Sequence, residues 1–167
     1  MRRETPTTID TLGSDPSSLQ SATFIITDAA DAEAPLFTLV RQCEDHPWSE
    51  KNIASALADP CAFHFLLCRK ADGALCSYVL ARLIADELEI DKVGTHPDFR
   101  RRGCATTLLK YLLEQAKERG CRRAFLEVRA GNRAAQACYG ALGFTVASVR
   151  KRYYESQEDA IIMSRGL

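Results

Sequence analysis

The chain has 167 residues, 46% of them hydrophobic, and its 22 lysines and arginines are balanced by 22 aspartates and glutamates. This length and composition predict one globular domain, and the zero net charge argues against a general nucleic-acid binder. No apolar run approaches the roughly 18 residues of a membrane span, and the N-terminus lacks the apolar region of a secretory signal.

The cysteines and histidines further narrow the class of protein to which the chain can belong. The seven cysteines are an odd number and include no C-x-x-C pair, which indicates reduced thiols in a cytoplasmic protein. His46, His64 and His96 are too scattered to predict a zinc site. We expect no metal, no membrane partner and no direct nucleic-acid partner.

The first half of the chain predicts a tail, followed by strands and two helices. Residues 1–22 are rich in Thr, Ser, Pro and Asp and predict a flexible tail, so the folded domain is expected over residues 23–167. Ser49 is a candidate N-cap for the second helix. Apolar spacing and turn residues predict a strand at 24–27, helices at 31–43 and 49–57, a hairpin of strands at 63–69 and 75–84, and a strand at 88–95.

The second half alternates helices and strands. Apolar residues recur at helical spacing from Ala105 to Ala116, which predicts the clearest amphipathic helix of the chain. Gly120 marks its expected end. The pattern then predicts a buried strand at 124–129, a helix capped by Asn132 at 132–142, and strands at 144–149 and 160–163.

A glycine-containing basic loop, R-R-R-G-C-A at 100–105, leads into that amphipathic helix. Backbone N–H groups at the start of a helix have no intrahelical partner, and the helix dipole favours anions there. We expect Gly103 to let a phosphate approach the backbone, because glycine has no Cβ. The loop is therefore a candidate seat for a pyrophosphate. The alternatives are a solvated cationic patch or an RNA contact. No aromatic residues are interleaved with the arginines, which makes the RNA contact the weaker interpretation.

The element order and R-x-x-G-x-A resemble the GNAT superfamily of acyl-CoA-dependent N-acetyltransferases. Several segments resemble its RimI-type branch, the ribosomal-protein alanine N-acetyltransferases: P-W-S-E at 47–50, F-L-E-V-R-A-G-N at 125–132, Y-G-A-L-G-F at 139–144, R-Y-Y at 152–154 and E-D-A-I-I-M at 158–163. The likeness covers residues 24–164. It implies a single α/β (α+β) domain whose central twisted sheet is mixed, mostly antiparallel, and has six to seven strands with about four helices.

The resemblance also implies that the chain binds acetyl-CoA. Val93, Gly94 and Thr95 would hydrogen-bond the pantetheine as an added pseudo-strand, and a backbone N–H near Val93 is a candidate oxyanion donor. The strands that carry Val93 and Leu126 would part to admit the thioester. Asn132 would touch the cofactor. The diphosphate would rest on the backbone N–H groups of Arg101, Arg102, Gly103, Cys104, Ala105 and Thr106.

Acetyl transfer needs a base for the amine and a proton for the departing thiolate, and the resemblance assigns these roles to Glu127 and Tyr139. A free α-amine titrates near 7.7–8.0, so one carboxylate is enough. Strand alternation places Phe125, Glu127 and Arg129 on one face. A carboxylate inside an apolar strand is expected to be buried, which suits a base.

Other roles remain open for these residues. Glu127 could form a structural ion pair with Arg129 or Arg101, and Glu89 and Asp91 on the preceding strand are rival bases. Tyr139 lies on a core stripe, where packing alone would explain it.

For five further residues, both a packing role and a functional role remain open. Asn132 could be only an N-cap. Cys104 could be a reactive thiol or a small apolar core residue. Trp48 is either packed in the core or shapes the acceptor entrance, and the same holds for the pair Tyr153 and Tyr154 at a strand end.

The implied reaction is acetyl transfer from acetyl-CoA to the N-terminal α-amine of a protein, and the expected acceptor is the N-terminal alanine of a small ribosomal subunit protein. A monomer is expected. The alternatives are a GNAT enzyme for a free small amine and a non-catalytic acyl-CoA-binding GNAT protein.

The acidic run from Asp86 to Asp91 is expected to attract a basic peptide. Relatives usually carry an apolar residue and Asn where this chain has Asp91 and Lys92, and an aliphatic residue at Cys104.

Overall fold

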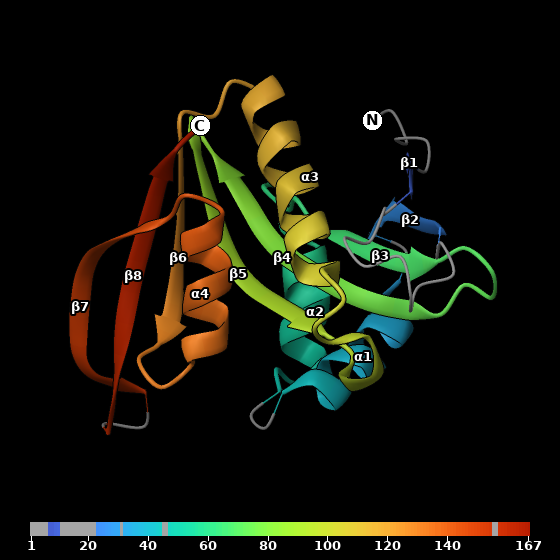
Figure 1. Cartoon of the computed structure of the whole chain (residues 1–167), viewed down its shortest axis with the longest axis horizontal. Helices are drawn as coiled ribbons and strands as arrows, with labels where there is room; N and C mark the ends of the chain where they lie inside the picture. Colours follow the sequence, from blue (N-terminus) through green and yellow to red (C-terminus); the bar gives the residue numbers. More distant parts are fainter. Residues whose placement is uncertain (1–6, 11–22, 31, 45–46, 155–156) are drawn as a thin grey trace, which may run out of the picture. The chain divides into compact units, whose positions relative to one another are not determined.

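The computed structural model describes residues 7–10, 23–30, 32–44, 47–154 and 157–167. The helices in this part of the chain are α1 (Glu33–Cys43), α2 (Glu50–Leu57), the short 3-10 helix η1 (Pro97–Phe99), α3 (Cys104–Glu118) and α4 (Arg133–Ala141) (Figure 1). The strands are β1 (Thr7–Asp10), β2 (Thr23–Asp28), β3 (Phe65–Arg69), β4 (Leu75–Ile84), β5 (Glu87–Thr95), β6 (Arg123–Arg129), β7 (Thr145–Tyr154) and β8 (Glu158–Gly166). From β2 onward, this is the order of elements that the sequence predicts.

The strands form one mixed sheet in the order β1-β2-β3-β4-β5-β6-β8-β7. β5 and β6 run parallel, whereas β1 and β2, β2 and β3, β3 and β4, β6 and β8, and β7 and β8 pair antiparallel. The parallel pair requires a crossover, which α3 supplies between β5 and β6. The predicted mixed, mostly antiparallel sheet is confirmed.

The sheet has one strand more than predicted, because β1 lies within the segment expected to be a flexible tail. Its residues pair with β2 from Thr7↔Ile26 to Asp10↔Thr23. Backbone pairing needs no apolar side chains, so the polar composition of this segment does not indicate that a strand forms there. The remainder of the predicted tail, residues 1–6 and 11–22, lies outside the described residues.

Contacts divide the chain into two compact units: residues 1–80 with 92–108, and residues 81–91 with 109–167. β4, β5 and α3 each begin in one unit and end in the other. In the described part of the chain, every helix is too short or too polar to span a bilayer.

The core of the first unit lies between its helices and its strands. Leu36, Leu39 and Val40 of α1 and Ile53 of α2 pack with Ala29, Leu66, Tyr78 and Leu80. Ser49 caps α2, since its hydroxyl accepts the Asn52 N–H at 3.2 Å, as the sequence predicts. Burying these apolar side chains holds α1 and α2 against β3 and β4.

The second unit is built around β6, β8 and α4. Alternation along β6 buries Ala124, Leu126 and Val128 and leaves Phe125, Glu127 and Arg129 half-buried, which confirms the predicted faces. Gln136 of α4 donates to Arg129 O and Ala130 O at 3.1 and 2.9 Å, which fastens α4 to the end of β6 (Figure 1).

β7 lies at the end of the strand order, and its residues are exposed from Thr145 to Tyr153. It pairs with β8 in a register that shifts twice, between Val146 and Ser148 and between Arg150 and Tyr154. The sequence predicts a strand that stops at Val149. The observed strand continues through a basic segment, where Lys151 Nζ donates to Asp159 at 2.8 Å.

Candidate active site

The loop between β5 and α3 has the backbone geometry that an anion seat requires. Arg101 and Gly103 have positive φ values of 59° and 77°. The Thr107 N–H donates to Gly103 O at 2.8 Å, the bond that opens α3. The N–H groups of Gly103, Cys104 and Ala105 precede this bond, so they have no helical carbonyl to pair with. These groups lie at the positive end of a 15-residue helix.

The structure adds a conformational reason for glycine at position 103 to the predicted one, which stays a prediction. A Cβ built on Gly103 would meet nothing within 4 Å, so open space already surrounds it. Its φ of +77° is what demands glycine, because L side chains are strained in that region. Gly103 therefore sets the path by which the chain enters α3.

The three arginines of the loop have different roles. Arg100 donates to Thr95 O at 3.3 Å and to Cys43 O at 3.1 Å, so it fastens the loop to the protein. Arg101 and Arg102 are exposed and form no ion pair with a described residue. Arg102 lies 5.8 Å from the centroid of the Phe99 ring. Two cations are thus left to attract the charge of a diphosphate.

Cys104 packs into the core at the start of α3. It is buried, and burial raises the pKa of its thiol despite the opposing charge of Arg102. A raised pKa leaves less thiolate at neutral pH, which is the reactive form. The interpretation as a small apolar residue is therefore favoured over a reactive thiol.

The end of β5 presents backbone groups on the edge that faces away from β4. Ser77 Oγ donates to Gly94 O at 2.6 Å, and the His96 N–H donates to Cys76 O at 2.9 Å. Backbone polar groups alternate in direction along a strand, so those of Val93 and Thr95 point away from β4. Thr95 O is taken by Arg100. Val93 thus offers a donor and an acceptor at this edge, and Thr95 offers its N–H, as a pseudo-strand ligand requires.

The parallel ladder between β5 and β6 is short. It runs from Glu87↔Arg123 to Ile90↔Leu126 and includes no described residue beyond these. β6 continues to pair on its other side with β8, as far as Arg129↔Ala160. The ladder therefore stops before Val93, at the point where the sequence predicts that the two strands part.

Glu127 is half-buried and ion-paired, which corrects the expectation that it is buried. Its Oε1 accepts from Arg150 of β7 at 2.5 Å, and 32% of its side chain is exposed. Neither Arg129 nor Arg101 is its partner. Arg129 instead pairs with Glu158 at 3.0 Å and lies 4.1 Å from the centroid of the Tyr154 ring. The sequence analysis missed Arg150, which lies 23 residues from Glu127 and carries no local signal.

Tyr139 lies on α4 in a buried position. Its ring packs edge-on against Phe144 with centroids 6.1 Å apart. Burial raises the pKa of its hydroxyl, and neighbouring Cys138 and Tyr154 raise it further. The hydroxyl therefore stays protonated at neutral pH, as a proton donor must be.

Asn132 caps α4, because its side-chain oxygen accepts the Ala135 N–H at 3.1 Å. The cap interpretation is confirmed. The contact between Asn132 and the cofactor stays a prediction. Asn132, Glu127 and Tyr139 belong to the second unit, whereas residues 93–95 and 101–106 belong to the first.

Part of the acidic run on β5 is compensated within the protein. Arg82 donates to Glu89 at 2.7 Å and to both oxygens of Asp91 at 3.0 Å. Both rival bases are therefore engaged by one guanidinium. This guanidinium balances only one of the two negative charges, so the attraction of a basic peptide by this run stays a prediction.

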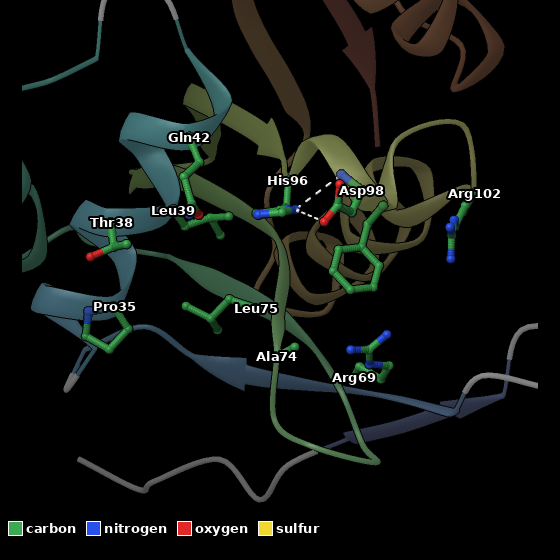
Figure 2. Close-up of a pocket in the computed structure, with 11 residues that line it drawn as sticks. Pro35, Thr38, Leu39, Gln42, Arg69, Ala74, Leu75, His96, Asp98 and Arg102 are labelled. Carbon is green, nitrogen blue, oxygen red and sulfur yellow. Dashed lines mark hydrogen bonds and ion pairs between the residues drawn. The ribbon is translucent and has the colours of Figure 1, made fainter.

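A cavity of about 540 Å³ lies in the first unit beside the loop (Figure 2). Figure 2 shows side chains from α1, from the β3–β4 hairpin and from the loop around it. His96 Nδ1 accepts the Asp98 N–H at 3.2 Å there. Of the predicted site residues only Arg102 reaches it. Its other lining residues are Pro35, Thr38, Leu39, Gln42, Arg69, Ala74, Leu75, His96, Asp98 and Phe99.

No group of three or more His, Cys, Asp or Glu side chains in the described residues is placed to hold a metal ion. The first unit instead presents backbone amides and arginines at the loop before α3, and the second unit carries Glu127 and Tyr139. Amides and arginines suit an anionic ligand.

Comparison with known proteins identifies the class. Residues 30–144 match the model of the acetyltransferase (GNAT) family. The [ribosomal protein bS18]-alanine N-acetyltransferase of Escherichia coli is 36% identical over 121 residues, which are 71% of this chain and 80% of that protein. The chain therefore belongs to the GNAT family of acetyltransferases.

Two further comparisons agree. The N-alpha-acetyltransferase RimI of Mycobacterium tuberculosis is 35% identical over 141 residues, 81% of this chain and 83% of that protein. The crystal structure of the ribosomal-protein-S18-alanine N-acetyltransferase from Escherichia coli superposes with a TM-score of 0.80 at 31% identity, over 86% of this chain and 93% of that one. The single GNAT fold predicted from the sequence is confirmed.

Proposed function

We propose that this protein transfers the acetyl group of acetyl-CoA to the N-terminal α-amine of a protein. The backbone at the start of α3 carries the proposal. There, Gly103 turns the chain so that amides without helical partners lie beside two arginines that have no ion pair among the described residues. Such a seat suits a diphosphate, and the GNAT family uses one diphosphate-bearing acyl donor, acetyl-CoA.

The acceptor we propose is the N-terminal alanine of a small ribosomal subunit protein. The support is the activity named for the Escherichia coli relative, which is 36% identical to this chain over 80% of its own length. An acceptor of this kind implies that the enzyme acts in the cytoplasm. A monomer suffices for this reaction, because all proposed roles fall on one chain.

Residues of this chain have three roles in the proposed reaction. Acetyl-CoA supplies an activated acyl carbon. The Val93 N–H stabilises negative charge on the acyl oxygen. Glu127 takes a proton from the acceptor amine through a water molecule, and its half-buried side chain retains enough exposure to meet that water. Tyr139 donates a proton to the departing sulfur.

An acetylation assay tests the proposal. The full chain is incubated with acetyl-CoA and with peptides that start with Ala, Ser or Met, and with spermidine as a free amine. We expect a mass increase of one acetyl group on the α-amine of the Ala peptide, located by fragmentation. Acetylation of spermidine alone would favour an enzyme for free small amines. Calorimetric binding of CoA without turnover would favour a non-catalytic acyl-CoA-binding protein.

A further inference from the structure

Four side chains of the first unit form what we call the Glu44 network: Glu44, Tyr78, Lys92 and Trp48. The Tyr78 hydroxyl donates to one oxygen of Glu44, and Lys92 Nζ donates to the other. Lys92 Nζ also lies 5.1 Å from the centroid of the Trp48 ring. The Glu44 carboxylate therefore joins β4 to β5, and Lys92 adds Trp48 to the assembly.

The Glu44 network is largely removed from water. Tyr78 is fully buried, and the side chains of Lys92 and Glu44 are only 15% and 20% exposed. An ion at this depth is costly unless an opposite charge and hydrogen bonds accompany it. Lys92 and Glu44 therefore depend on each other, and loss of either charge leaves the other uncompensated.

The network lies beside the part of β5 that the proposed reaction uses. Lys92 directly precedes Val93, and alternation along the strand places Lys92 and Gly94 on one face. On that face a Cβ at Gly94 would come within 2.2 Å of the Tyr78 ring, so Tyr78 packs directly on the β5 backbone. This packing supports the strand that carries Val93 and does not involve the Lys92 ammonium, so it remains when the charge of Lys92 is removed.

The network also holds both ends of the connection between α1 and α2. Glu44 is the C-cap residue of α1, and Trp48 immediately precedes Ser49, the N-cap of α2. Glu44 is fastened to β4 and β5, and Trp48 is covered by the Lys92 ammonium.

We propose that Glu44 and Lys92 are positioning residues for the acceptor peptide. They hold the end of α1 and Trp48 at the acceptor entrance and do not contact the reacting atoms. This inference rests on the proposed function, because it assigns the acceptor side of the same site. It predicts that removal of either charge weakens acceptor binding and leaves the cofactor seat at 101–106 intact.

Steady-state kinetics with the Ala peptide test this division. We expect Lys92→Met and Glu44→Gln to raise the peptide KM about tenfold, while kcat and the acetyl-CoA Kd stay within about twofold of wild type. Lys92→Arg keeps the charge and stacks on an aromatic ring, so it should retain the wild-type KM. Asp72→Asn breaks the exposed Arg69–Asp72 pair of the same unit and serves as the matched control.

The fluorescence of Trp48 gives a readout that needs no turnover. Trp48 is the single tryptophan of the chain, so emission excited at a wavelength that tyrosine does not absorb reports on this side chain alone. We expect Lys92→Met to change the emission, because the ammonium over the ring is gone, and Asp72→Asn to leave it unchanged. Titration of the CoA-bound enzyme with the Ala peptide should give a Kd about tenfold weaker in Lys92→Met than in wild type.

Several outcomes would overturn the inference. An unchanged peptide KM and Kd in Lys92→Met and Glu44→Gln would show that the network does not serve the acceptor. An equal loss of acetyl-CoA affinity, or a failure of Lys92→Arg to restore KM, would point to a general structural role. A wild-type protein that binds acetyl-CoA but neither binds nor acetylates any peptide would refute the proposed function itself, and the inference with it.

Discussion

Tyr139 combines a buried position with a hydroxyl that stays protonated. Because burial raises its pKa, the neutral phenol persists through neutral and mildly alkaline pH, and the supply of its proton does not fall as pH rises there. We expect Tyr139→Phe to lower kcat about 100-fold. The ring and its packing on Phe144 remain, so the acetyl-CoA Kd should be nearly unchanged by calorimetry. Tyr153→Phe, at an exposed tyrosine, is the control. A Tyr139→Phe enzyme with normal kcat would exclude the acid role.

Glu127 has two possible roles, as a base or as the partner of Arg150, and two variants separate them. Glu127→Gln removes the carboxylate, whereas Arg150→Met removes only its partner. We expect Glu127→Gln to lower kcat/KM about 100-fold and to abolish the part of its rise with pH that the base provides. Arg150→Met should keep most of the activity and the pH profile. Equal losses in both variants would mean that the ion pair itself is what matters.

The sequence predicts the faces on which the candidate residues lie better than it predicts their partners. Glu127 stands out because it is a carboxylate within an apolar strand, and alternation gives its face correctly. Its partner Arg150 comes from another strand and is decided by the register of β7 on β8, which no local pattern reveals. The same holds for Arg82, which donates to both Glu89 and Asp91.

Two glycine substitutions can separate the effect of a strained turn on stability from the effect of the turn before α3 on ligand binding. Gly103→Ala forces an L side chain to a φ of +77°, which should destabilise the fold by about 1–2 kcal/mol. It should also weaken acetyl-CoA binding, because the amides that follow are displaced. Gly73→Ala is a matched control, since Gly73 has a φ of +71° and open space but lies in the β3–β4 turn. Denaturant unfolding and calorimetry measure both effects. Equal acetyl-CoA affinity in the two variants would contradict the anion seat.

At the level of elements, prediction succeeds where side chains repeat with a period. α3 and β6 follow their apolar periodicity closely, and both predicted N-caps, Ser49 and Asn132, are confirmed. The sequence does not predict β1 or the second half of β7, because both are polar and are defined by backbone pairing to a neighbouring strand. Such strands are fixed by register, and a single sequence contains no record of register.

For the molecule as a whole, the elements that the two units share predict joint unfolding. β4, β5 and α3 each contribute residues to both units, so neither unit has a complete set of strands and helices alone. We expect urea denaturation to give one transition, with the same midpoint by Trp48 emission, which reports on the first unit, and by far-ultraviolet circular dichroism. Two separate midpoints would show that the units unfold independently. The sequence predicts one continuous domain and gives no indication of the two units.

The outer strand β7 has a consequence for how the protein behaves at high concentration. An even, exposed strand that carries Val146 and Val149 would invite another copy to add its own strand and start a fibril. Two features make this edge strand irregular: the extra residue at the first register shift, Ala147, and the positive φ of Arg152. Deleting Ala147 would restore a regular register at the first shift. We expect concentrated solutions of that variant to become turbid and to bind thioflavin T, while the wild-type protein stays clear.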